Sequence, residues 1–296
     1  MFLSARSVKS ILTGSIVLLL LLSLGLVTGA GVTKEGIVLS ADDRTEVRYD
    51  TGVYVSDLNA LLNQASGKET LDSNTSLQLF RMEKDSKVSP DSILSIPEVL
   101  FIFNGTASIY VDETVVTGNQ GDAVYIPPNV TRMIENDSKE DLQFLSIIDW
   151  NYVAIDDSSD SIADEGVLIK SERTVTPFEL ANENIGDEFQ FYRLLHPSEK
   201  PLMISYDLGV IKGPAGASVP DHYLDGMSQL MFINQGRGNV SVGCIDSEVR
   251  GGDILYIAPG AVMNISATED LEFMMITSPF YRPLADHLID DACVEI

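Results

Sequence analysis

The chain has 296 residues, of which 45% are hydrophobic, and a formal net charge of −25 at pH 7. This length is enough for two domains of ordinary size, each with its own core. So acidic a protein is excluded as a typical nucleic-acid binder, because the phosphate backbone repels a negative surface. The acidic residues are spread along the whole chain, which indicates a solvated surface and not a single acidic docking tail.

Residues 1–30 have the pattern of an export signal. Arg6 and Lys9 precede an apolar stretch at residues 11–27, and small residues follow it. This is the layout of a cleavable signal peptide. The uncharged run over residues 11–32 is also long enough to cross a bilayer as a retained anchor. Both alternatives place the rest of the chain outside the cytoplasmic membrane, so we expect a protein that is secreted or anchored by its N-terminus.

Two further features of the sequence are compatible with export. Asn-X-Ser/Thr sequons, the acceptors of N-linked glycans, occur at Asn74, Asn104, Asn129, Asn136, Asn239 and Asn264. Six sequons in one exported chain predict a glycoprotein. The two cysteines, Cys244 and Cys293, either form a disulfide outside the cell or remain as buried thiols, and the sequence leaves both readings open.

Two blocks of the sequence recur with a fixed offset of 131 residues. The segment 98–105 reads EVLFIFNG and the segment 229–236 reads QLMFINQG. Downstream, GDAVYIPPN at 121–129 corresponds to GDILYIAPG at 252–260 with the same offset. A shared offset with no gap between the blocks indicates a duplicated domain.

The duplication sets the predicted domain organisation. Acidic and serine-rich sequence between the copies is typical of an exposed linker. We therefore predict a first barrel, a linker, a second barrel and a C-terminal tail at residues 36–152, 153–166, 167–282 and 283–296.

Short segments rich in β-branched and aromatic residues, separated by Gly, Pro, Asn and Asp, predict antiparallel strands in both copies. They lie at residues 99–103, 107–111, 123–126, 142–148, 230–233, 239–242, 254–257 and 271–276. Helical periodicity is weak except at residues 55–64 and 283–290. Many short strands with one wet face are typical of a jelly roll, so the sequence predicts an all-β protein.

The repeated blocks resemble the two motifs of the cupin superfamily. The first motif reads His-X-His, three or four residues, Glu, six residues, Gly. The second reads Gly, five residues, Pro-X-Gly, two residues, His. The residues that fit are Glu98, Gly105, Gly121, Pro127 and Asn129 in the first copy, and Gly236, Gly252 and Gly260 in the second, where Gln229 replaces the glutamate. Asn129 replaces a motif glycine and is the residue type that best tolerates a positive φ. The resemblance implies two tandem cupin-type jelly-roll barrels, each a double-stranded β-helix.

The resemblance also implies a metal held by three histidines and one carboxylate in each barrel, but most of these side chains are replaced. The corresponding positions hold Asp91, Ile93, Glu98 and Arg132 in the first copy, and His222, Leu224, Gln229 and Met263 in the second. One carboxylate or one imidazole is fewer than the three protein ligands of even a catalytic zinc site. We therefore expect degenerate metal sites and no metal or other cofactor.

The replacements suggest what each barrel does instead. Since the carboxylate and the last histidine of a cupin bind one ion, Glu98 and Arg132 should face each other as an ion pair. This pair either is structural or presents the Arg132 guanidinium to a ligand carboxylate or phosphate. In the second copy, His222 and Gln229 beside Met263 suit a small uncharged ligand such as a sugar or an amide, although a lone histidine is more often structural.

These observations favour binding over catalysis. The sequence contains no Gly-X-Ser-X-Gly, phosphate-loop, Cys-X-X-Cys or His-Glu-X-X-His motif. We predict an exported bicupin that binds a small molecule or a cell-surface partner, with a homodimer as one possible assembly. The alternatives are a cupin enzyme resembling the aminohydrolases, isomerases or dioxygenases, and a structural protein of the cell envelope.

Overall fold

The computed structural model describes residues 36–67, 75–89, 93–149, 166–177 and 188–289. The predicted export segment and nearly all of the predicted linker lie outside these residues. In the described part of the chain, no helix is both long enough and apolar enough to span a membrane.

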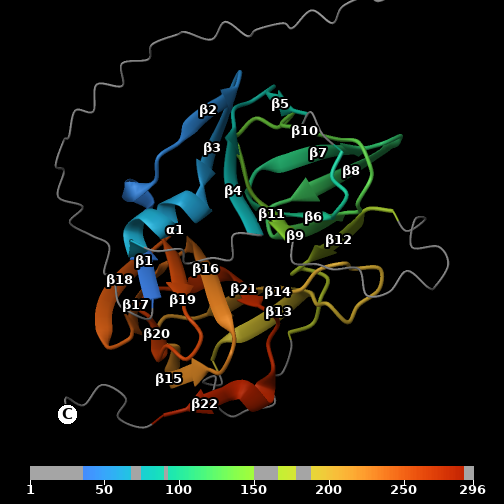
Figure 1. Cartoon of the computed structure of the whole chain (residues 1–296). Helices are drawn as coiled ribbons and strands as arrows, with labels where there is room; N and C mark the ends of the chain where they lie inside the picture. Colours follow the sequence, from blue (N-terminus) through green and yellow to red (C-terminus); the bar gives the residue numbers. More distant parts are fainter. Residues whose placement is uncertain (1–35, 68–74, 90–92, 150–165, 178–187, 290–296) are drawn as a thin grey trace, which may run out of the picture.

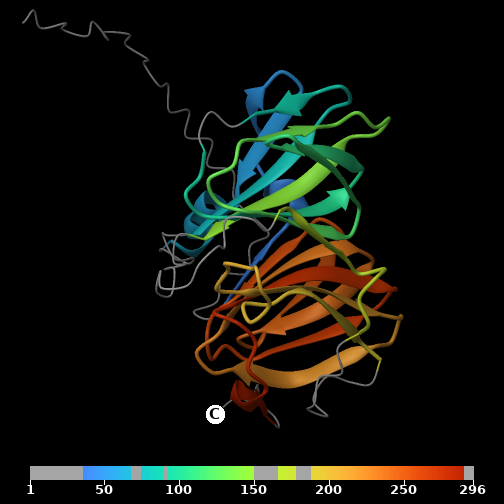
Figure 2. The ribbon, with the colours of Figure 1, turned by 90° about the vertical axis from the view of Figure 1, so that its right-hand side faces the viewer.

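The fold consists of two stacked β-barrels, each made of two facing sheets (Figures 1 and 2). In barrel 1, one sheet has the strand order β12-β9-β6-β11-β4-β3-β2 and the other has the order β5-β10-β7-β8. The strands are β2 (Val47–Asp50), β3 (Val53–Asp57), β4 (Thr75–Met82), β5 (Lys87–Val88), β6 (Glu98–Asn104), β7 (Thr106–Val111), β8 (Thr114–Asn119), β9 (Asp122–Ile126), β10 (Arg132–Glu135), β11 (Leu142–Asp149) and β12 (Leu168–Ser171).

Barrel 2 repeats this arrangement. Its sheets have the orders β1-β19-β16-β21-β14-β13 and β18-β17-β20-β15-β22. The strands are β1 (Gly36–Leu39), β13 (Gln190–Leu195), β14 (Asp207–Gly213), β15 (Ser218–Leu224), β16 (Ser228–Gln235), β17 (Arg237–Val242), β18 (Ile245–Arg250), β19 (Ile254–Ile257), β20 (Met263–Ala267), β21 (Leu271–Ser278) and β22 (Asp286–Leu288). All eight strands predicted from the sequence are present, and the all-β expectation is confirmed.

The two helical expectations need correction. Strand β3 runs to Asp57, and only then does helix α1 (Leu58–Ser66) begin, with the Asp57 carboxylate accepting from the Ala60 N–H at 3.0 Å. This side chain is an N-cap, so it marks the boundary that periodicity alone placed too early. Near the C-terminus, only the short 3₁₀ turn η3 (Pro283–Ala285) forms before strand β22 pairs with β15. Pairing with a sheet edge overrides the weak helical pattern there.

The barrels exchange one edge strand. In Figure 1, β1 lies beside β19 of barrel 2, although the residues that follow it build barrel 1. Conversely, β12 pairs with β9 of barrel 1. Ile37 pairs with Tyr256, and Leu168 pairs with Tyr125. The repeat offset of 131 residues separates Ile37 from Leu168 and also Tyr125 from Tyr256. The two strands are therefore equivalent elements that have changed places, and the structural barrels differ at their edges from the two halves of the sequence.

The larger sheets of the two barrels pack face to face. On β6, Phe101 and Phe103 point toward the other barrel, whereas Leu100 and Ile102 point into barrel 1. The rings of Phe103 and Phe232 stack across the interface with their centroids 3.9 Å apart. Because these sheets are buried on both faces, β6 and β16 read as nearly continuous apolar runs instead of alternating ones.

The turns of the second motif have the backbone that the sequence requires. Asn129 has φ 62° and its counterpart Gly260 has φ 78°. Asparagine therefore replaces glycine here while keeping the left-handed conformation, as predicted.

Candidate functional site

The interior of barrel 1 contains the expected ion pair. Glu98 begins β6 and Arg132 begins β10, and the two side chains are in contact, each with 6% of its surface exposed. The hydroxyl of Ser146 on β11 donates to the other carboxylate oxygen of Glu98. The charges thus compensate each other within the barrel, and the predicted pair is confirmed. Its role in ligand binding stays a prediction.

Barrel 2 has neutral side chains at the same three positions. Gln229 corresponds to Glu98, and Met263 corresponds to Arg132, since Met263 pairs with Val242 as Arg132 pairs with Val111. Met275 corresponds to Ser146, since Met275 pairs with Met231 as Ser146 pairs with Leu100. The amide Nε2 of Gln229 donates to the Met275 sulfur at 3.1 Å. Barrel 2 therefore lacks the ion pair that occupies the centre of barrel 1.

A small cavity of about 40 Å³ lies at this place in barrel 2. Its wall is mainly apolar, with four polar side chains among the residues that line it. The lining residues are Phe191, Ile211, Val219, His222, Leu224, Gln229, Met231, Met263, Ile265, Phe273, Met275, Tyr281 and Asp286. Of the predicted site residues, His222, Gln229 and Met263 are brought together here.

Asp286 is a cavity residue that the sequence analysis missed. It lies on β22, which pairs with β15, the strand that carries His222, and Asp286 itself pairs with Leu224. Asp286 is outside the duplicated motifs, and no local pattern marks it. Only the return of the C-terminal segment to the barrel places its carboxylate at the cavity.

Two buried acceptor atoms at the cavity, Oε1 of Gln229 and Oδ1 of Asp286, have no hydrogen-bond partner within the described part of the chain. The carbonyl of Pro220 accepts from Nδ1 of His222 at 2.9 Å, so Nε2 is an acceptor in the tautomer with its proton on Nδ1. Since buried acceptors without partners cost free energy, this cavity suits a ligand or water molecules that donate hydrogen bonds.

Two of the donors at the cavity already have partners. The Tyr281 hydroxyl donates to Oδ2 of Asp286 at 2.7 Å. Burial, followed by the hydrogen bond to Asp286, raises the pKa of Tyr281, so this hydroxyl keeps its proton. With the Gln229 amide donating to Met275, the cavity offers acceptors and almost no free donors.

A second ionisable cluster supports this wall of the cavity. Oδ2 of Asp207 accepts from the backbone N–H of Tyr281 at 2.9 Å, and its Oδ1 lies 3.5 Å from Nε2 of His196. Burial raises the pKa of Asp207, while the Tyr281 N–H and the charges of His196 and Arg193 oppose that shift. Asp207 thereby holds the backbone of Tyr281 in the position from which its hydroxyl reaches Asp286.

Part of the sequence and the whole architecture are similar to known proteins. Residues 81–148 match the family described as Cupin domain. This segment lies within barrel 1, which therefore contains a match to a cupin domain. No curated protein sequence matches the chain.

Solved structures share this two-barrel fold at low sequence identity. A putative glyoxylate-induced protein from Pseudomonas aeruginosa aligns with a TM-score of 0.67 and 12% identity, over 86% of this chain and 92% of that one. The S161A mutant of Bacillus subtilis oxalate decarboxylase aligns with a TM-score of 0.62 and 13% identity, over 87% and 80%. The 7S globulin of Momordica charantia gives 0.61 and 15%, over 81% and 83%. These likenesses concern the fold alone.

The side chains inside the two barrels do not fit the metal that the resemblance to cupins implies. Among the described residues, no group of three or more His, Cys, Asp or Glu side chains could hold an ion. In barrel 1 the Arg132 guanidinium takes up the Glu98 carboxylate, and a metal there would face a positive charge. Ile93, assigned to a ligand position from the motif, is 57% exposed, and Asp91 lies outside the described residues.

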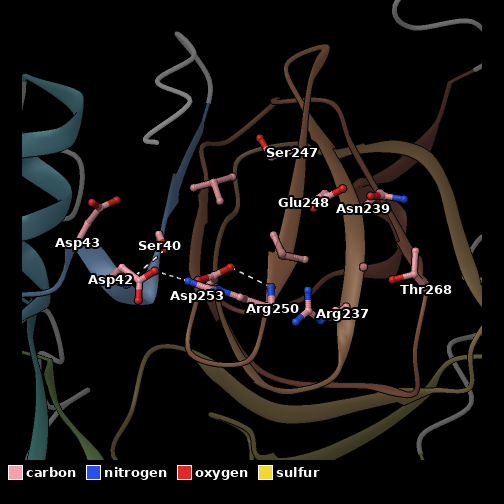
Figure 3. A pocket seen from close by; sticks show the side chains of 13 residues that line it. Ser40, Asp42, Asp43, Arg237, Asn239, Ser247, Glu248, Arg250, Asp253 and Thr268 are labelled. Carbon is pink, nitrogen blue, oxygen red and sulfur yellow. Dashed lines mark hydrogen bonds and ion pairs between the residues drawn. The ribbon is translucent and has the colours of Figure 1, made fainter. Parts of the chain in front are cut away.

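A larger open groove of about 750 Å³ lies between β1 and the β17–β18 hairpin of barrel 2 (Figure 3). Arg237 and Arg250 pair across the hairpin. Each is balanced by an acid of this chain, Arg250 by Asp42 and Arg237 by Glu269. Because these charges are compensated, the groove points less clearly to a ligand than the cavity of barrel 2 does.

Proposed function

We propose that this bicupin is an exported protein that binds a small molecule in the cavity of barrel 2 without metal chemistry. The observation that carries the proposal is the pair of unpartnered acceptors on Gln229 and Asp286 at a largely apolar cavity that His222 also lines. An apolar pocket with a few convergent polar groups is the usual form of a small-molecule site.

The interior of barrel 1 supports different roles for the two barrels. Its corresponding position is filled by the Glu98–Arg132 pair, whose charges and hydrogen bonds are provided from within the barrel. Barrel 2 keeps the same scaffold with neutral side chains and open space. Barrel 1, with its ion pair, has a structural role, and barrel 2, with its cavity, binds the ligand.

Export is supported by the state of Cys244, which is disulfide-bonded. The only other cysteine of the sequence is Cys293, which lies outside the described residues. Disulfides persist mainly in oxidising compartments outside the cytoplasm. The apolar segment at residues 11–32 and the sequons agree with such a location.

Ligand-observed NMR with a panel of small alcohols, amides and amines tests the binding proposal. The wild-type protein should give saturation-transfer signals for members of the panel. Met263→Phe, which adds a ring to the cavity wall, should abolish them. Val115→Phe adds the same ring on β8 of barrel 1, where residue 115 is exposed, and should leave the signals unchanged.

Two outcomes contradict the proposal. Signals that persist at full strength in Met263→Phe would place the ligand elsewhere, and the absence of any signal from the whole panel would remove the evidence for a cavity ligand. Metal analysis of the purified protein tests the alternative that the chain is a metal-dependent enzyme. One firmly bound transition-metal ion per chain would contradict a function without metal chemistry.

A further inference from the structure

The hydrogen-bonding character of the barrel 2 cavity narrows the class of its ligand. We infer that this cavity takes a small protonated amine, an alkylammonium ion. The inference rests on the proposed function, since it names the ligand class of the same site.

The first argument is the match between donors and acceptors. An ammonium group brings three N–H donors and no acceptor. The cavity presents two unpartnered acceptors, Oε1 of Gln229 and Oδ1 of Asp286, and Nε2 of His222 is a third acceptor when the ring proton is on Nδ1. A carboxylate, a phosphate or an amide carbonyl would bring acceptors into a cavity where the Tyr281 hydroxyl donates to Asp286 and one of the two N–H groups of Gln229 donates to Met275.

The second argument is charge. Asp286 is a buried carboxylate, and among the described residues that line the cavity none is Lys or Arg. Arg193 does not line the cavity, and its charge acts on Asp207 and Tyr281. A buried carboxylate is stabilised best by a cation with which it also hydrogen-bonds. The net charge of −25 further favours the approach of a cation.

The third argument is the wall and its size. The rings of Phe191, Phe273 and Tyr281 line the cavity together with the sulfur-bearing side chains of Met263 and Met275. Aromatic faces attract ammonium ions, and they also accept the alkyl part. The volume of about 40 Å³ has room for about three water-sized groups, so ethylammonium is of suitable size.

Titration calorimetry with four probes at neutral pH tests the inference: ethylammonium, ethanol, acetamide and acetate. We expect ethylammonium to bind and the neutral and anionic probes to bind at least roughly tenfold more weakly, because only the cation satisfies Asp286. Asp286→Asn should reduce the affinity for ethylammonium by a similar factor, while its amide oxygen can still accept from Tyr281. Asp42→Asn removes one carboxylate at the groove of Figure 3 and should leave the affinity unchanged.

The outcomes distinguish this inference from the proposed function. If ethanol or acetamide binds as well as ethylammonium, and Asp286→Asn has no effect, the amine assignment is overturned while the cavity remains a binding site. If Asp42→Asn weakens binding as much as Asp286→Asn does, the effect is one of general charge, and the assignment also fails. If no probe binds, or if binding survives in Met263→Phe, both the amine assignment and the use of this cavity are wrong.

Discussion

The guanidinium of Arg132 contacts the carboxylate of Glu98 inside barrel 1, where 6% of each side chain is exposed. Three positions, those of Glu98, Arg132 and Ser146, form one charged unit in barrel 1 and become an amide and two thioethers in barrel 2. The duplication thus preserved a scaffold while the two interiors diverged.

Removing one partner of this pair should be strongly destabilising. Arg132→Met leaves the Glu98 carboxylate buried without a counter-charge, and we expect the free energy of unfolding to fall by about 3–5 kcal/mol. The double variant Glu98→Gln/Arg132→Met should recover much of that loss. Urea unfolding of the single and double variants measures the coupling.

The control for this prediction is Lys84→Met, which breaks the exposed contact of Lys84 with Asp85 and should change stability by less than about 1 kcal/mol. If Arg132→Met were equally mild, the pair would not be an essential part of the core. A structural role also predicts that ligand affinity in the folded fraction of Arg132→Met is unchanged.

The first-motif glycines should differ between the barrels in their tolerance of a side chain. Gly105 and Gly236 have φ of 83° and 85°, so alanine at either position pays roughly 1–2 kcal/mol in backbone strain. A Cβ on Gly236 would lie 2.0 Å from the Asp270 carbonyl oxygen, whereas one on Gly105 would lie 3.0 Å from that of Asp141. Chemical unfolding should therefore show a larger loss for Gly236→Ala.

Gly216→Ala provides the matched control, because Gly216 has φ 95° and a Cβ there would meet nothing within 4 Å. Its loss of stability reports strain alone. Equal losses in all three variants would mean that the neighbouring carbonyls move aside and that the clash has no consequence.

Asp253 should hold the exchanged strand β1 in place. Its carboxylate accepts from the backbone N–H groups of Ala41 and Arg250, each at 2.8 Å. Asp253→Ala removes both acceptors, and we expect β1 to open more readily, by roughly 1–3 kcal/mol. Hydrogen–deuterium exchange of residues 36–39 measures this opening, with Asp43→Ala on the exposed side of η1 (Ala41–Asp43) as the control. Unchanged protection in Asp253→Ala would show that strand pairing alone holds β1.

The raised pKa of Asp207 predicts a pH dependence. The folded carboxyl binds its proton more tightly than the unfolded one, whose ordinary value is 3.8, because burial disfavours the charged form. The free energy of unfolding should therefore fall as pH rises from below 3.8 through the raised pKa. Asp207→Asn removes this loss, so the stability of this variant relative to the wild type should increase over that window.

Urea unfolding over a pH series checks the Asp207 prediction. Asp225→Asn, at an exposed position of the same barrel, controls for the loss of one negative charge. If the free energies of unfolding of the wild type and Asp207→Asn changed in parallel with pH, the charges of His196 and Arg193 would cancel the effect of burial on the pKa of Asp207.

The sequons should differ in their use if the chain passes through a glycosylating secretory pathway. Asn136 is fully buried, and its Nδ2 donates to the carbonyls of Met82 and Glu140 at 2.9 and 2.8 Å. Asn239 is exposed on β17. Glycopeptide mass spectrometry should find glycan at Asn239 and none at Asn136. A glycan at Asn136 would mean that modification precedes folding of barrel 1.

The sequence by itself determined the duplication and eight of the strands, which depend on short apolar segments, turn glycines and one constant offset. The Asn129 turn belongs to the same class, because its positive φ is a property of a single residue in its own segment. The pairing of Glu98 with Arg132 was predicted from the resemblance to the cupin motifs.

Only the tertiary structure decided which strand completes which barrel and that Asp286 joins His222 and Gln229 at the cavity. Strand β1 joins β19, more than half the chain away, and β22 brings Asp286 back beside His222. Ile93 points outward although it fits a motif position. Pairings of this kind are fixed by which open sheet edge a distant segment can reach, and that competition leaves no mark in the local sequence.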